Sequence, residues 1–220
     1  MGSRFDDIKL LLQSDGAREE GKELFENLIS SVLGDPIAVK KVIKTITNMP
    51  MFINETIFYE NFRLFLSESF SCEEELRVFS QKLDEDGNKR ENAKRIIKII
   101  DSIESEKKTR YVINLTRSCI AGFLSVKDYF RLCTVVKNTI LEDLDFLSQK
   151  IKEKDLELTP ETLNLSNQGL MYMSVIGTPG EYSFLELAEM LDKFGISYGD
   201  EEKYKYSSPK HTRAECESES

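Results

Sequence analysis

The chain contains a single histidine, His211, and this residue limits the chemistry that the sequence can support. Histidine-based triads and most zinc sites need an imidazole that a rigid scaffold holds in place. His211 lies instead in the polar and charged segment KYKYSSPKHTRAECESES, whose apolar content is too low to offset the entropy of ordering. No GxxxxGK or GxGxxG run is present to bind phosphates. We therefore predict no catalytic, cofactor-binding or metal-binding residues, and a protein that is not an enzyme.

Three carboxylates, Glu142, Asp143 and Asp145, form the other group that could do chemistry. Paired acids can hold magnesium or act in acid–base catalysis, so a carboxylate-dependent nuclease is one interpretation. Side chains one and two residues apart, however, point around a helix and do not converge. Near a helix start, where the macrodipole favours anions, such acids commonly form a solvated face. We favour the solvated face.

A basic stripe is the best candidate for a binding site. Arg90, Lys94 and Lys98 follow one another at four-residue spacing, and the run continues past the expected helix end with Lys107, Lys108 and Arg110. Such a stripe could contact the phosphates of a nucleic acid or an acidic protein surface. Neighbouring glutamates neutralise part of it, and a charged face opposite isoleucines is typical of any exposed amphipathic helix. We predict these six residues as partner or nucleic-acid contacts, with a solvated helix face as the alternative.

Two arginines lie inside apolar segments. Arg117 is part of NLTRSCI and Arg131 is part of DYFRLC. A buried guanidinium needs a charged or hydrogen-bonding partner, and Asp101 or Asp128 could provide it. We predict that these four residues form buried ion pairs between helices.

Composition and charge narrow the class of protein. The chain has 220 residues, 40% of them hydrophobic, and this is enough for one large domain or two small ones. No apolar run approaches the roughly 20 residues of a membrane-spanning helix, and the first residues lack the features of a signal peptide. The four cysteines are scattered without CxxC pairs. The net charge of -9 repels polyphosphates, which counts against nucleic-acid binding. We expect a cytoplasmic protein that does not enter a membrane.

Hydrophobic periodicity predicts a mainly α-helical fold. Apolar residues recur with helical spacing between residues 17 and 154, and the strongest pattern covers Lys89 to Glu104. Local signals predict where helices start: Asp35 as an N-cap after Gly34, a capping box from Ser71 to Glu74, and the same pattern at Ser125. Thr159 followed by Pro160 predicts a further start, for a short helix to Asn167.

The stretch GLMYMSVIGTPGEYSFLELAEMLDKFGI changes from strand to helix periodicity. It predicts two strands joined by a turn at Thr178–Gly180, then a helix from Leu185 that Gly195 ends. This order is typical of a winged helix.

We expect a multi-helix bundle with a small hairpin-plus-helix end. The chain is divided as follows: a flexible N-terminus over residues 1–16, a helical body over residues 17–137, a winged-helix-like region over residues 138–199, and a disordered tail over residues 200–220.

A winged helix that reads DNA needs cations on the helix before its hairpin, because phosphate contacts supply most of the affinity. That segment, Thr159 to Gln168, contains no lysine or arginine. The turn has no cation either, and glutamates follow it. We therefore interpret the hairpin as a structural cap or a protein-docking surface.

The chain also resembles a family. The order MPMFINETIFYENFRLFL, AKRIIKIIDSIESEKKTRYVINLTRSCIAGFLSVKDYFRL, LEDLDFLSQKI, GLMYMS and YSFLELAEMLDKFGISYG is similar to a group of uncharacterised bacterial proteins associated with prophages and other mobile elements. The resemblance covers roughly Leu24 to Gly199. It implies a helical body with a winged-helix-like end in a bacterial or phage cytoplasm, in the context of phage–host conflict. It implies no catalytic residues.

Together these patterns predict a non-enzymatic protein-binding factor, such as an inhibitor, sensor or adaptor, whose partner is another protein that the sequence does not identify. The alternative is a DNA-binding transcriptional regulator that uses the basic stripe. The sequence leaves open whether the protein forms a homodimer.

Overall fold

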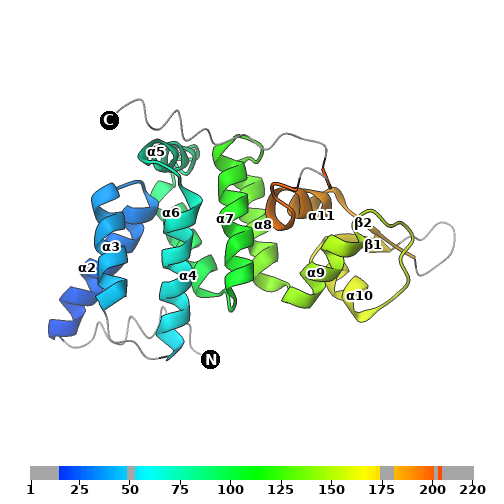
Figure 1. Cartoon of the computed structure of the whole chain (residues 1–220), viewed down its shortest axis with the longest axis horizontal. Coiled ribbons are helices and arrows are strands. Elements are labelled where there is room, and N and C mark those ends of the chain that lie inside the picture. Colours follow the sequence, from blue (N-terminus) through cyan, green and yellow to red (C-terminus); the bar gives the residue numbers. More distant parts are fainter. Residues whose placement is uncertain (1–14, 49–52, 174–180, 201–202, 205–220) are drawn as a thin grey trace. The chain divides into compact units, whose positions relative to one another are not determined.

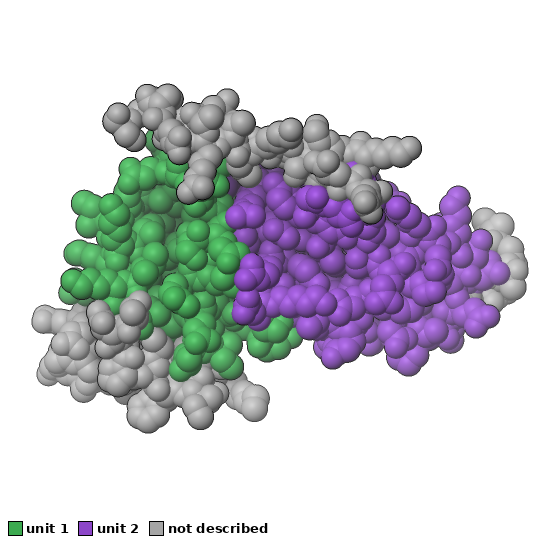
Figure 2. All heavy atoms as spheres, viewed as in Figure 1, with its two compact units in different colours: residues 1–105, 216–220 green, residues 106–215 purple. Residues whose placement is uncertain are grey.

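The computed structural model describes residues 15–48, 53–173, 181–200 and 203–204. In this part of the chain the fold is mainly α-helical, with ten α-helices, one π-helix and one two-stranded sheet (Figure 1). The chain divides into two compact units (Figure 2). Unit 1 comprises residues 1–105 and 216–220, and unit 2 comprises residues 106–215. The predicted boundary after residue 137 falls inside unit 2, in the last turn of a helix, and stays a prediction.

Unit 1 is built from five helices in its described part. Helix α2 contacts both α3 and α6, and α4 also contacts α3 and α6. The bounds are α2 (Asp15–Val32), α3 (Pro36–Asn48), α4 (Ile53–Ser69), α5 (Glu73–Lys82) and α6 (Lys89–Asp101). The core between them is aromatic and aliphatic: Phe62, Phe65, Phe79, Ile96 and Ile100 are fully buried. The helical spacing of Ile96 and Ile100 in the sequence predicted the buried face of α6.

The turn between α2 and α3 confirms a local prediction. Gly34 has φ +94°, a conformation that glycine adopts without strain, and a side chain there would meet Cβ of Ser80 at 3.1 Å. The Asp35 carboxylate accepts hydrogen bonds from the backbone N–H groups of Ile37, at 2.9 Å, and Ala38, at 3.2 Å, so it caps α3 as predicted.

The predicted capping box at Ser71 is wrong. The N-cap of α5 is Cys72, whose side chain makes no capping hydrogen bond. The Ser71 backbone N–H instead donates to the Glu75 carboxylate at 2.6 Å. Helix α5 therefore begins one residue later than the serine pattern indicates. Glu75, and not Glu74, accepts the hydrogen bond from the Ser71 backbone.

Unit 2 begins with a pair of packed helices, α7 and α8, to which the remaining elements attach. Helix α7 also contacts η1, α9 contacts α10, and α10 contacts β1. The bounds are α7 (Glu106–Ile120), α8 (Val126–Asn138), α9 (Leu141–Lys150), α10 (Pro160–Asn167), β1 (Met171–Met173), β2 (Tyr182–Phe184), α11 (Glu186–Leu191) and the π-helix η1 (Asp192–Ile196).

Two predicted helix starts in unit 2 are confirmed. The Ser125 hydroxyl accepts a hydrogen bond from the Asp128 backbone N–H at 3.1 Å at the start of α8. Thr159 and Thr162 form a reciprocal capping box around Pro160 at the start of α10. Short-range signals of this kind are readable because both partners lie within one turn of the chain.

The predicted hairpin strands are confirmed. Strands β1 and β2 are antiparallel, with Met171 opposite Phe184, Tyr172 opposite Ser183 and Met173 opposite Tyr182. Leu156 extends the pairing on the other side of β2, because its backbone exchanges two hydrogen bonds with Tyr182. The predicted turn at Thr178–Gly180 lies outside the described residues.

The prediction that Gly195 ends the last helix is wrong. The helix continues beyond α11 as η1, and Gly195 lies inside this π-helix. A side chain at Gly195 would meet the Leu115 side chain of α7 at 3.3 Å. The glycine therefore permits a close approach between η1 and α7 rather than a chain reversal.

Candidate functional site

The basic stripe of α6 is partly neutralised by the protein's own carboxylates. Arg90 pairs with Glu26 of α2, with 2.6 Å between Nη2 and Oε1, and Lys94 pairs with Glu91 at 2.6 Å. The hydrogen bond from Arg90 lowers the pKa of Glu26 below its ordinary value. Lys98 is exposed on the same helix. Two of the three predicted contact residues on α6 therefore already serve intramolecular ion pairs.

The predicted contacts on α7 have three different environments. The Lys107 ammonium donates hydrogen bonds to both carboxylate oxygens of Asp145 in α9, at 2.7 and 2.8 Å. This interaction raises the pKa of Lys107. Arg110 pairs with Glu106 one turn earlier, at 2.8 Å. Lys108 is only 1% exposed, and its ammonium donates to the Lys137 carbonyl at 3.3 Å near the end of α8. Buried in this way, Lys108 is not available to a partner, which corrects the prediction for this residue.

The predicted buried ion pairs are also revised. Arg131 is exposed on α8, because it lies on the helix face opposite Phe130 and Cys133, and so it is not a buried ion-pair residue. Asp128 accepts a hydrogen bond from the Ser125 hydroxyl at 2.6 Å and belongs to the helix cap. Arg117 and Asp101 are half-buried, in unit 2 and unit 1 respectively, and their pairing stays a prediction.

The carboxylates of α9 do not share one environment. Glu142 is exposed, Asp145 is bound by Lys107, and Asp143 is buried. Burial raises the pKa of Asp143, a hydrogen bond with Asn164 of α10 acts in the opposite direction, and the charges of Glu161 and Glu142 raise it further. Among the residues that the structure describes, no three acidic, histidine or cysteine side chains are grouped to hold a metal ion.

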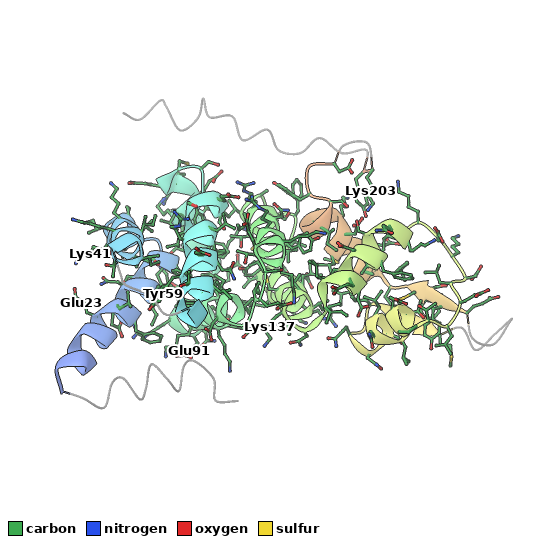
Figure 3. The ribbon with its side chains drawn as sticks, turned by 60° about the horizontal axis from the view of Figure 1, so that its bottom comes forward. Glu23, Lys41, Tyr59, Glu91, Lys137 and Lys203 are labelled. Carbon is green, nitrogen blue, oxygen red and sulfur yellow. The ribbon has the colours of Figure 1, made fainter. Side chains whose placement is uncertain are left out.

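A buried polar cluster fastens residues 203–204 to η1, and we call this cluster the clasp. Asp192 is fully buried, and Lys203 approaches its Oδ2 atom at 2.8 Å. The Tyr204 hydroxyl donates to the same oxygen, and the Ser197 hydroxyl donates to Oδ1 at 2.9 Å. Lys203 also donates to the Ser148 carbonyl of α9 at 2.7 Å. Lys203 lies beside the ribbon of η1 in Figure 3.

The charges of the clasp are paired with one another, so the clasp does not present a free base. The Lys203 ammonium lies 2.9 Å from the Ser148 hydroxyl, a distance that would suit a serine–lysine pair in catalysis. The same ammonium, however, is the counter-ion of a fully buried carboxylate, which would be costly to leave unpaired. The π-helix is held from the other side by Asn114 of α7, whose amide donates to the Gly195 carbonyl at 2.8 Å.

Exposed apolar side chains concentrate at a different place in unit 2. Nine large hydrophobic residues are exposed in the described part of the chain, and five of them lie between residues 158 and 185. Leu158 is 63% exposed, and Tyr172 and Met173 are each 50% exposed. Leu163 lies on α10, Tyr172 and Met173 lie on β1, and Leu158 and Leu185 come just before α10 and α11. These elements adjoin, since α10 contacts β1, β1 pairs with β2 and β2 contacts α11. We call this region the hairpin end; its apolar members are Leu158, Leu163, Tyr172, Met173 and Leu185.

The hairpin end also carries acids without cations. From Asp155 to Asp192 the sequence has seven carboxylates and no lysine or arginine. Asp192 belongs to the clasp, and Glu161 is hydrogen-bonded to Thr159, which lowers the pKa of Glu161. No salt bridge within the described residues involves the six acids Asp155, Glu157, Glu161, Glu181, Glu186 and Glu189.

Comparisons of the chain with protein-family models, curated proteins and solved structures find no match. No helix in the described ranges is both long enough and apolar enough to cross a membrane. The site must therefore be judged on its geometry and charge alone.

Sequence reasoning missed the clasp, although part of the signal was present. Asp192 stands four residues after Ala188 and next to Leu191, on the buried face of the helix, where a carboxylate needs a partner. The partner could not be found, because Lys203 and Tyr204 lie in a segment whose composition indicates disorder. The sequence also gave no sign that Leu163 and Tyr172 are exposed, because apolar residues in a periodic pattern are normally buried.

Proposed function

We propose that the protein is a non-enzymatic protein-binding factor that docks its partner at the hairpin end. One observation carries the proposal: five of the nine exposed large hydrophobic side chains of the described residues lie on α10, on β1 and just before α10 and α11. Single exposed hydrophobic residues are normal on a protein surface, but a concentration on adjoining elements with a polar rim is typical of interaction sites.

The kinds of residue at this end support the proposal. Tyrosine and methionine are enriched at the centres of protein interfaces, and here Tyr172 and Met173 are half exposed on one short strand. The strand is anchored, because Met171 and Leu170 beside them are buried. A rigid scaffold that presents apolar side chains needs little ordering on binding.

Site-specific photo-crosslinking in cells tests the proposal. A photoreactive amino acid replaces Tyr172 in the full chain, and the same amino acid replaces Ile37 of α3 as a matched control. Ile37 is also apolar and is 68% exposed, but it belongs to unit 1. We expect a discrete protein adduct from position 172 that the position 37 variant does not give.

A second substitution makes the result specific. Leu163→Asp places a charge at a position of α10 that is 47% exposed. It should remove the adduct from position 172 while the circular dichroism spectrum stays unchanged. Equal adducts from positions 37 and 172, or an adduct at 172 that survives Leu163→Asp, would contradict docking at the hairpin end.

A further inference from the structure

The charge of the hairpin end defines the chemistry of its partner. Resting on the proposed function, we infer that the hairpin end binds a cationic amphipathic segment of another protein, with an apolar face against Tyr172 and Leu163 and basic side chains toward the surrounding glutamates. The apolar members supply burial, and the unpaired acids select the sign of the partner's charge.

The position of the acids supports this inference. Glu157 directly precedes the exposed Leu158 in the sequence, and Glu186 directly follows the exposed Leu185. Glu189 is also exposed, one turn further along α11. A rim of one charge around an apolar centre steers partners of the opposite charge and rejects partners of the same charge.

The absence of internal cations strengthens the argument. Elsewhere in the described residues some acids are paired, as Glu26 is with Arg90 and Asp145 is with Lys107. At the hairpin end the six carboxylates have no such salt bridge, although this arrangement repels itself. A cationic partner would relieve that repulsion.

Asp143, which is buried at the α9 side of α10, also experiences the negative field of Glu161. Its carboxylate is buried against α10, hydrogen-bonded to Asn164, and its pKa is raised by burial and by the charges of Glu161 and Glu142. The field also argues against a nucleic acid at this surface, since phosphates would meet carboxylates without a single lysine or arginine from residue 155 to residue 192.

Fluorescence anisotropy with two synthetic peptides tests the inference. The first peptide is helical, with leucine along one face and lysine along the other; the second has glutamine in place of every lysine. Titrated with the full chain, the lysine peptide should bind about tenfold more tightly than the glutamine peptide at low salt. The difference should shrink as salt screens the charges.

Two triple variants locate the effect. Glu157→Gln, Glu186→Gln and Glu189→Gln together should bring the lysine peptide close to the affinity of the glutamine peptide. The matched control replaces three exposed glutamates of unit 1, Glu60, Glu73 and Glu85, with glutamine and changes the net charge by the same amount. The control should leave the preference for lysine intact.

The other outcomes overturn the inference in distinguishable ways. Equal affinities for the two peptides would show that the partner is not selected by positive charge, while the crosslinking result could still uphold protein docking at the hairpin end. If both triple variants lost the preference for the lysine peptide equally, the preference would come from the net charge of the protein and not from the hairpin end. A dimer in sedimentation velocity that the Glu157, Glu186 and Glu189 variant abolishes would identify a second copy as the occupant instead.

Discussion

The basic stripe of α6 and the acidic hairpin end differ in whether their charges are already used. On α6, Arg90 and Lys94 reach carboxylates at 2.6 Å within unit 1. At the hairpin end, the exposed Glu157, Glu186 and Glu189 have no salt bridge to any described residue. In the sequence, the basic stripe is the more conspicuous of the two, because its residues recur at helical spacing. In the structure, two of the three cations of the α6 stripe are paired, whereas these three glutamates are not.

Pairing, as well as charge, therefore affects which surface is available to a partner. An exposed ion pair contributes only about 0–1 kcal/mol, so a phosphate could still compete for Arg90. It would have to displace Glu26 to do so, and it would act against a net charge of -9. A cation at the hairpin end displaces nothing.

The largest expected effect concerns the clasp, where charge is both buried and paired. Lys203→Met keeps the side-chain stem but leaves the Asp192 carboxylate buried without its counter-ion. We expect the free energy of unfolding to fall by about 3 kcal/mol, because breaking a buried pair strands the remaining charge. Urea denaturation followed by circular dichroism measures the change. Lys154→Met, at an exposed lysine of the same unit, is the control, and an equally small loss in both variants would show that the clasp is not stabilising.

The next effect is a loss of affinity for the lysine peptide, and it tests whether the apolar members of the hairpin end contribute to binding. Tyr172→Ala should weaken the lysine peptide about tenfold, since truncating a tyrosine at an interface centre typically costs more than 1 kcal/mol. Stability should change little, because Tyr172 is half exposed. Anisotropy titration gives the affinity, and Ile37→Ala serves as the control. An unchanged affinity for Tyr172→Ala would place the binding surface elsewhere.

A smaller effect, on stability, is expected from a substitution in the basic stripe of α6. Arg90→Gln removes the exposed ion pair with Glu26 and should lower the free energy of unfolding only slightly, less than either change above. The pKa of Glu26, now held below its ordinary value by Arg90, should rise toward that value, which carboxyl NMR titration can follow. A Glu26 pKa that does not move would show that the pair is not formed in solution, and the stripe would then be free after all.

The smallest effect is a pH dependence at the edge of the hairpin end. Because the folded-state pKa of Asp143 lies above its ordinary value of 3.8, its contribution favours folding at low pH and is lost as pH rises through the raised pKa. Asp143→Asn should therefore stabilise the protein at neutral pH relative to wild type, by less than about 1 kcal/mol, and have less effect below pH 3.8. Unfolding midpoints at both pH values test this sign; a larger gain at the lower pH would contradict it.

The elements that the sequence predicts correctly depend on neighbours along the chain. The buried face of α6, with Ile96 and Ile100, follows from helical spacing, and the caps at Asp35 and Thr159 involve partners within one turn. The buried position of Lys108 could also have been found. It stands on the same α7 face as Val112, Leu115 and Cys119, which are all buried, but its charge led to the opposite expectation.

What the sequence could not provide are contacts between distant residues. Lys107 pairs with Asp145, which is 38 residues away in the sequence, and Arg90 pairs with Glu26, which is 64 residues away. The clasp joins Ser148 to Lys203 across 55. No local pattern encodes such pairs, and they decide which of the candidate charges are free. The candidate site therefore emerged only when these contacts were known.

The most direct test of the central claim is an NMR titration of the full, isotopically labelled chain with the lysine peptide. If the free charges and exposed apolar residues form the binding surface, amide shifts will change in α10, β1, β2 and the start of α11. Amides of α2 and α6 will stay unchanged. Shifts centred on α2 and α6, around Glu26 and Arg90, would contradict the account.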